Sequence, residues 1–101
     1  MLENEIALVT GASRGIGRAI AIRLGEQGAT VIGTATTGTG AASISDQLTA
    51  NAVKGRGMVL NVTDQGSVDS LLKEIASEYG APSILVNNAG ITRDNLLMRM
   101  K

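Results

Sequence analysis

The sequence predicts an α/β fold, a doubly wound parallel sheet with helices packed on its faces. Short apolar runs alternate with helical patterns along the chain, the connections between them are short, and a glycine-rich turn directly follows the first run. Strands of a parallel sheet are buried on both faces, so they are continuous apolar runs rather than alternating ones. These observations together favour repeated strand-helix-strand units.

The first half of the chain supplies two strands and two helices. Ile6–Val9 is a short, continuous apolar run that predicts the first strand, and residues 31–34 predict the second. Between them, Gly28 marks the end of a helix. That helix is predicted by apolar residues at helical spacing, namely Ile16, Ala19, Ile20 and Leu24. A weaker second helix is indicated by Ala41, Ile44 and Leu48.

The second half continues the same alternation. Gly55-Arg56-Gly57 is expected to break the chain before a third strand at residues 58–61, and Ile84–Asn87 predicts a fourth strand. This fourth strand is apolar on both faces and would leave a bare edge unless another strand paired with it. Residues 92–101 after it are amphipathic. Short connections between parallel strands imply right-handed crossovers.

The helix between the third and fourth strands has the clearest pattern. Asp64 or Ser67 can cap its start, and Gly80 followed by Pro82 ends it. Its apolar face is formed by Val68, Leu71, Leu72, Ile75 and Tyr79. Tyr79, the only aromatic residue of the chain, is therefore expected to be a core residue.

Composition excludes several classes of function. Nine basic residues balance nine acidic ones and are scattered, so we expect neither nucleic acid nor a membrane as partner. The chain has no cysteine and no histidine, which removes disulfides, thiolate metal sites and the commonest general base, and we expect no metal. It has neither a basic N-terminal region nor an apolar run of roughly 18 residues, so a cytoplasmic protein is expected.

The segment at residues 10–17 is the strongest functional signal. Gly11 permits a tight turn off the first strand, Gly15 leaves room for a pyrophosphate, and Gly17 lets helix and strand pack closely. The helix that follows offers free N–H groups to the phosphates. A glycine-rich loop without a ligand is the alternative, but the position between a strand and a helix favours a dinucleotide. Arg18 follows Gly17, which excludes a P-loop.

The spacing of the motif, Gly-x-x-x-Gly-x-Gly, together with Asn87-Asn88-Ala89-Gly90, resembles the short-chain dehydrogenase/reductase family. The resemblance implies a Rossmann-type sheet, of which this chain holds the first four strands in the order 3-2-1-4. It also implies that Asn61 and Val62 contact the adenine. Residues 88–90 are implied to line the ribose and nicotinamide side of the cofactor.

The end of the second strand predicts NADP(H) rather than NAD(H). A carboxylate there usually holds the 2′-hydroxyl of the ribose, but residues 34–37 contain no acid. The guanidinium of Arg14 can donate paired hydrogen bonds to a 2′-phosphate, and the hydroxyl of Thr36 can add another. A solvated surface charge is the alternative for Arg14. The expected cofactor-binding residues are Gly11, Ala12, Ser13, Arg14, Gly15, Ile16, Gly17, Thr36, Asn61, Val62, Asn88, Ala89 and Gly90.

Over nearly its whole length the chain resembles the bacterial 3-oxoacyl-acyl-carrier-protein reductases of that family, most specifically at residues 91–100. The resemblance implies NADPH-dependent reduction of a 3-oxoacyl chain on acyl carrier protein to the 3-hydroxyacyl form in fatty-acid synthesis, and a homotetramer when full length. A non-catalytic dinucleotide-binding fragment and a reductase of another carbonyl compound are the alternatives. Ser83 departs from relatives, which often have Asp there, and only a local effect is expected.

No catalytic residue is assigned. The family's catalytic motif is Tyr-x-x-x-Lys, but four residues after Tyr79 stands Ser83. We therefore expect residues 1–101 to be the N-terminal part of a single NADP-binding Rossmann domain whose C-terminal catalytic part is absent.

Overall fold

The structure of the chain is a computed structural model that describes residues 2–13, 15–61, 64–87 and 96–99. Strands and helices alternate along it up to the fourth strand, as the sequence predicts. The elements are β1 (Ile6–Val9), α1 (Gly15–Glu26), β2 (Thr30–Ala35), α2 (Gly38–Ala50), β3 (Gly55–Val59), α3 (Gln65–Glu78), β4 (Ile84–Asn87) and β5 (Leu96–Arg99).

The described strands form one sheet in the order β3-β2-β1-β4-β5. β1 pairs in parallel with β2 and β4, and β2 pairs in parallel with β3, which confirms the predicted order 3-2-1-4. β5 was not predicted. It pairs antiparallel with β4, with Ile84 opposite Arg99 and Asn87 opposite Leu96, and so covers the edge that β4 would otherwise leave bare.

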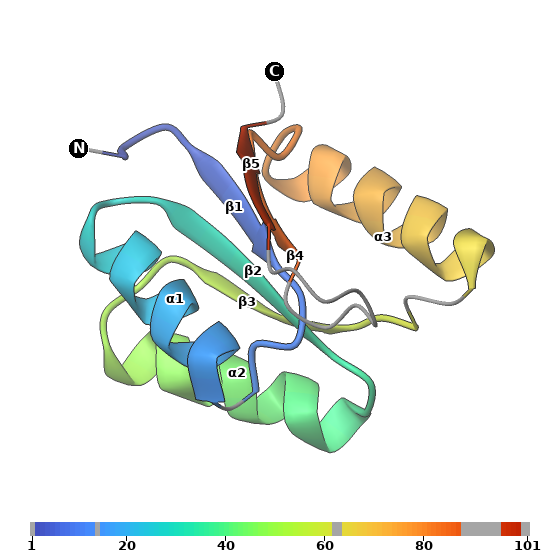
Figure 1. Ribbon diagram of the computed structural model, residues 1–101, viewed down its shortest axis with the longest axis horizontal. Coiled ribbons are helices and arrows are strands. Elements are labelled where there is room, and N and C mark those ends of the chain that lie inside the picture. The colour runs from blue at the N-terminus through green and yellow to red at the C-terminus, as the bar shows by residue number, and fades with distance from the viewer. Residues whose placement is uncertain (1, 14, 62–63, 88–95, 100–101) are drawn as a thin grey trace.

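The helices cover both faces of the sheet: α1 and α2 lie on one face and α3 lies on the other (Figure 1). Successive strand residues point to opposite faces, so Ala7 and Val9 of β1 join the core beneath α1 and α2, whereas Leu8 joins the core beneath α3. Tyr79, which was expected in the core, packs half-buried against this second core rather than within it. The two thin aliphatic cores are those of a doubly wound α/β protein.

α1 turns only part of its apolar pattern toward the sheet. Its buried residues are Gly17 and Ala21, and Ile20 is only partly buried against the core. Ile16 is 64% exposed and Ala19 is also exposed, so of the four apolar positions that predicted the helix only Ile20 and Leu24 pack against the core. The small residues Gly17 and Ala21 let the helix lie close to the sheet. The close packing gained in this way outweighs the burial of a larger apolar side chain such as that of Ile16.

The predicted third strand exists, but its predicted bounds, residues 58–61 after a break at residues 55–57, were wrong, because β3 begins at Gly55 and ends at Val59. The physical reason is the close approach of α2. A Cβ at Gly57 would stand 2.0 Å from the carbonyl oxygen of Ala41 in α2, and the Gly57 N–H donates to Ser45 Oγ at 2.9 Å. The glycine therefore lies within the strand and lets the helix pack on it.

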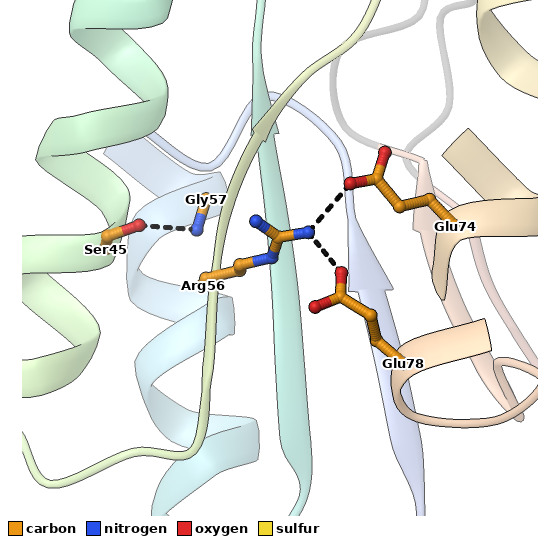
Figure 2. A network of polar contacts seen from close by, with 5 residues as sticks. All are labelled: Ser45, Arg56, Gly57, Glu74 and Glu78. Carbon is orange, nitrogen blue, oxygen red and sulfur yellow. Dashed lines mark hydrogen bonds and ion pairs between the residues drawn. The ribbon is translucent and has the colours of Figure 1, made fainter. Parts of the chain in front are cut away.

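Side-chain polar contacts fix α3 at its start and along its length. Asp64 is the N-cap: its Oδ1 accepts from the N–H groups of Gly66 and Ser67 at 3.0 and 3.4 Å, so of the two predicted caps Asp64 is the correct one. Arg56 of β3 donates to Glu74 at 2.9 Å and also to Glu78, which ties the edge strand to α3 (Figure 2).

Two negative findings concern the described part of the chain. None of its helices has the length and hydropathy that a membrane span requires. Its acidic residues form no group of three that could hold a metal ion.

Candidate cofactor site

The glycine turn leaves the carboxyl end of β1 and enters α1. Gly11 and Gly15 have φ of 64° and 65°, a left-handed conformation that glycine adopts without steric cost. Thr10, Gly11, Ala12 and Ser13 form the described part of the turn, and α1 begins at Gly15. The predicted residue Arg14 lies outside the described residues.

Hydrogen bonds to the strands on both sides hold the turn in place. The N–H of Thr10 donates to the carbonyl of Val86 in β4 at 3.0 Å, and its Oγ1 donates to the same oxygen at 3.4 Å. The N–H of Ala12 donates to the carbonyl of Thr34 in β2 at 2.9 Å. Thr10 and Ala12 are both buried. The turn is thus anchored to both neighbours of β1 before it turns into the helix.

This position is the topological switch point of the sheet. The chain moves outward from β1 to β2 and β3, and then returns to the other side of β1 for β4. In open α/β sheets ligands bind at such a point, outside the carboxyl ends of the strands. The sequence motif and the sheet order therefore indicate the same place.

The turn is compatible with a pyrophosphate. Apart from Gly15, its two chain neighbours and the nearby helix backbone, no atom of the described residues lies within 4 Å of the position where a Cβ of Gly15 would stand, so the space there is open. The first N–H groups of α1 have no acceptor within the helix, and the partial positive charge of the helix N-terminus favours an anion. An open space next to a helix N-terminus is the arrangement that phosphate groups occupy in proteins.

The carboxyl end of β2 lies beside this turn. Thr34 is 1% exposed and belongs to the core, whereas Thr36 and Thr37 are exposed. Thr37 is the N-cap of α2, and its Oγ1 accepts from the N–H of Gly40 at 3.0 Å. Of these threonines, Thr36 is thus the exposed one that does not cap the helix. The capping role of Thr37 was not predicted, although a threonine directly before a helix is a common N-cap.

The carboxyl end of β3 reaches the same edge of the sheet. The N–H of Leu60 donates to the carbonyl of Ala35 at 2.9 Å, which extends the pairing of β3 with β2 beyond the strand itself. Asn61 is exposed there, and its N–H donates to Ser67 Oγ at 3.2 Å. Ser67 therefore contributes to the position of Asn61 rather than capping α3, a role that its place in the sequence did not reveal.

Not every predicted cofactor-binding residue can be placed. The structure brings one group to the carboxyl edge of the sheet: Gly11, Ala12, Ser13, Gly15, Ile16, Gly17, Thr36 and Asn61. The others lie outside the described residues: Arg14, Val62, Asn88, Ala89 and Gly90. The second motif begins where β4 ends, at Asn87, and Val86 just before it accepts the hydrogen bonds from Thr10.

Ser83, the residue that departs from the expected pattern, has a local role. Its Oγ accepts from the N–H of Ile6 at 3.0 Å, and its own N–H donates to the carbonyl of Ile6 at 2.8 Å. These bonds join the amino ends of β1 and β4, opposite the carboxyl edge of the sheet. The expectation of a local effect remains a prediction.

A glycine turn at the switch point of a doubly wound parallel sheet defines a dinucleotide-binding α/β protein. The family model described as short chain dehydrogenase matches residues 5–101. The chain belongs to the short-chain dehydrogenase family, whose activity implies a nicotinamide dinucleotide as cofactor.

Several curated proteins are similar to the chain. It is 66% identical over 99 residues to 3-oxoacyl-acyl-carrier-protein reductase FabG of Escherichia coli (strain K12), a match that covers 98% of the chain and 39% of the relative. It is 68% identical over 100 residues to the protein of the same name from Vibrio harveyi, covering 99% and 40%. The Pseudomonas aeruginosa protein of that name is 59% identical, with the same coverage. The chain thus spans about two fifths of the length of these relatives.

Proposed function

We propose that the chain binds NADP(H) and supplies the cofactor-binding part of a 3-oxoacyl-acyl-carrier-protein reductase. The observation that carries the proposal is the glycine turn, which is open beside Gly15 and anchored to β2 and β4 through Ala12 and Thr10. Identities of 59% to 68% to proteins that bear this reductase name support the substrate class.

The choice of NADP(H) over NAD(H) rests on the end of β2. Residues 34–37 contain no carboxylate to bind a 2′-hydroxyl or repel a 2′-phosphate, and Thr36 is exposed there. Arg14, four residues after Thr10, is proposed as the cationic partner of that phosphate, because a guanidinium binds phosphate oxygens in bidentate fashion. Gly15, Ile16 and Gly17 are proposed to lie against the pyrophosphate.

The remaining proposed contacts continue along the carboxyl edge of the sheet. Asn61 and Val62 are proposed for the adenine, and Asn88, Ala89 and Gly90 for the ribose and nicotinamide side. When bound, NADPH supplies the hydride that reduces the 3-keto carbon, and the keto oxygen takes a proton to become a hydroxyl.

The wider context is part of the same proposal. Residues 1–101 form the N-terminal part of one Rossmann domain, and the catalytic residues belong to sequence that this chain does not contain. Acyl carrier protein with a 3-oxoacyl chain is the proposed partner, in the cytoplasm, and the complete enzyme is proposed to be a homotetramer.

Two measurements test the proposal. The first is calorimetric titration of the 101-residue chain with NADPH and with NADH, in which NADPH is expected to bind about tenfold more tightly or better. Equal affinities would contradict the assignment of NADP(H). Binding of neither cofactor would contradict the cofactor site itself.

The second measurement uses a joined protein, in which this chain replaces the matching N-terminal part of the Escherichia coli relative. The joined protein is expected to oxidise NADPH when acetoacetyl-acyl carrier protein is added. If it folds and binds NADPH but does not turn over, the chain cannot serve as the cofactor-binding part of such a reductase. If it reduces only carbonyl compounds that are not attached to the carrier protein, the substrate class is wrong.

A further inference from the structure

The first turn of α2 follows directly after Thr36, the exposed residue at the end of β2. Thr37 has an extended backbone, with φ −129° and ψ 158°, and is the N-cap of this helix. Its Oγ1 accepts from the N–H of Gly40 at 3.0 Å. The backbone around Thr36 is therefore fixed on one side by β2 and on the other by the contact between Thr37 and Gly40.

Gly40 is closely surrounded. A Cβ at this position would stand 2.7 Å from the Cβ of Ala35, the last residue of β2, and 3.3 Å from Thr37 Oγ1. It would also contact the Cβ of Ser13, in the glycine turn, at 3.7 Å. A separation of 2.7 Å between two carbons is well inside van der Waals contact, and neither Ala35 nor the helix backbone has a flexible end that could move away. The lack of a side chain at Gly40 is thus what allows α2 to begin beside both the β2 end and the turn.

Gly38, two residues earlier in the same turn of the helix, is different. No atom lies within 4 Å of the position of its Cβ. Two glycines therefore lie in one helical turn, but only at Gly40 do the neighbouring atoms exclude a side chain.

We propose that Gly40 is a positioning residue for cofactor selectivity: through Ala35 and Thr37 it holds the segment with Thr36 where the 2′-phosphate of NADP(H) is recognised. This inference rests on the proposed function. Gly40 itself does not touch the cofactor. Its effect falls on the 2′-phosphate side, because the contact with Ser13 at 3.7 Å is an ordinary van der Waals contact and the glycine turn has its own anchors in the hydrogen bonds of Thr10 and Ala12.

The expected consequence is a loss of discrimination rather than a loss of binding. Gly40→Ala pushes the start of α2 away from Ala35 and strains the bond from its N–H to Thr37 Oγ1, so the segment with Thr36 moves relative to the turn. Loss of one hydrogen bond to a charged group changes affinity by about tenfold. The affinity for NADPH is therefore expected to fall about tenfold, and the affinity for NADH to stay within about twofold.

The test is the ratio of the dissociation constants for NADH and NADPH, measured by titration of the joined protein, which contains the whole chain. Gly40→Ala is compared with Gly38→Ala, which makes the same chemical change in the same helical turn. Thr37→Val removes the cap acceptor while it keeps the size of the side chain, and Thr37→Ser restores the hydroxyl. Thermal melts of each variant accompany the titrations.

The proposal is supported if the ratio falls about tenfold in Gly40→Ala and Thr37→Val but is retained in Gly38→Ala and Thr37→Ser. It is overturned if Gly40→Ala keeps the wild-type ratio, or if Gly38→Ala loses it equally. If Gly40→Ala does not fold, the Thr37 pair decides, and a Thr37→Val protein with the wild-type ratio overturns the proposal. An unmutated joined protein that binds both cofactors equally contradicts the proposed NADP(H) function instead, so the two failures are distinct.

Discussion

Gly57→Ala is a stringent test of how α2 packs on the sheet. The added Cβ would stand 2.0 Å from the carbonyl oxygen of Ala41 and 2.8 Å from the Cβ of Ile44. The N–H of the same glycine donates to Ser45 Oγ, as Figure 2 shows. The first of these contacts is with helix backbone, which cannot change rotamer to make room. The helix must therefore move away from β3 as a unit.

The size of the effect follows from three terms. Insertion of a methyl group into a filled space costs about 1–3 kcal/mol. Loss or lengthening of the bond between Gly57 and Ser45 costs about 0.5–1.5 kcal/mol more. The lower entropy of the unfolded chain with alanine returns about 0.4–1 kcal/mol. We expect a net decrease of about 2–3 kcal/mol in the free energy of unfolding, a large part of the stability of a domain of this size.

Urea unfolding followed by far-ultraviolet circular dichroism measures this decrease as a shift of the midpoint, with slope unchanged. Ser45→Ala isolates the hydrogen bond and is expected to cost about 1 kcal/mol. Gly38→Ala, where a Cβ meets open space, is expected to be neutral or to stabilise by up to about 1 kcal/mol. A Gly57→Ala protein as stable as the unmutated chain would refute the close packing of α2 on β3.

Two further predictions concern α3. Asp64→Ala removes the N-cap and is expected to cost about 1 kcal/mol in urea unfolding, whereas Asp64→Asn is expected to stay near wild type, since asparagine also caps helices. Equal losses in both variants would contradict the capping role. Arg56→Met removes the contacts with Glu74 and Glu78, which are partly exposed, so a loss of at most about 1 kcal/mol is expected, smaller in high salt. Burial works to lower the pKa of Arg56, but the hydrogen bond to Glu74 and the charge of Glu78 raise it overall. The stabilisation from the charged Arg56 guanidinium is therefore complete below the pKa of Arg56 in the unfolded chain, and it is lost only as the pH rises through the pKa in the folded protein. The difference in the free energy of unfolding between the unmutated chain and Arg56→Met is thus expected to stay constant across the neutral pH range.

β1, β2, β4 and the glycine turn could be predicted from the sequence because each has a local signature, and the sheet order followed from the resemblance to the family. Ile6–Val9 and Ile84–Asn87 are short runs that are apolar on both faces, which is typical of strands buried on both faces. The glycine spacing adds the position of the turn between a strand and a helix. Short-range pattern and tertiary structure agree in these segments.

Where the prediction failed, the deciding interaction was distant in sequence. The local sequence around Gly57 is typical of a chain break. The residue that requires a glycine there is Ala41 of α2, because its carbonyl oxygen leaves no room for a Cβ at position 57. Ile16 has the spacing of a core residue, but the side of α1 that lies closest to the sheet is centred on the small residues Gly17 and Ala21 and leaves Ile16 exposed. β5 exists through pairing with β4, which the pattern of residues 92–101 did not reveal.

The position of the glycine turn depends on strand register as much as on the residues of the turn itself. Val9 lies opposite Gly33 of β2 and Val86 of β4, and this register is what brings the carbonyls of Thr34 and Val86 to the turn. A slip of one residue would move either carbonyl by about 3.3 Å and turn the strand's core side chains to the other face. The apolar residues that fill the two cores therefore also fix the acceptors that anchor the turn. Changes in the core of β2 or β4 that leave the turn sequence intact can thus still displace the place where the cofactor is proposed to bind.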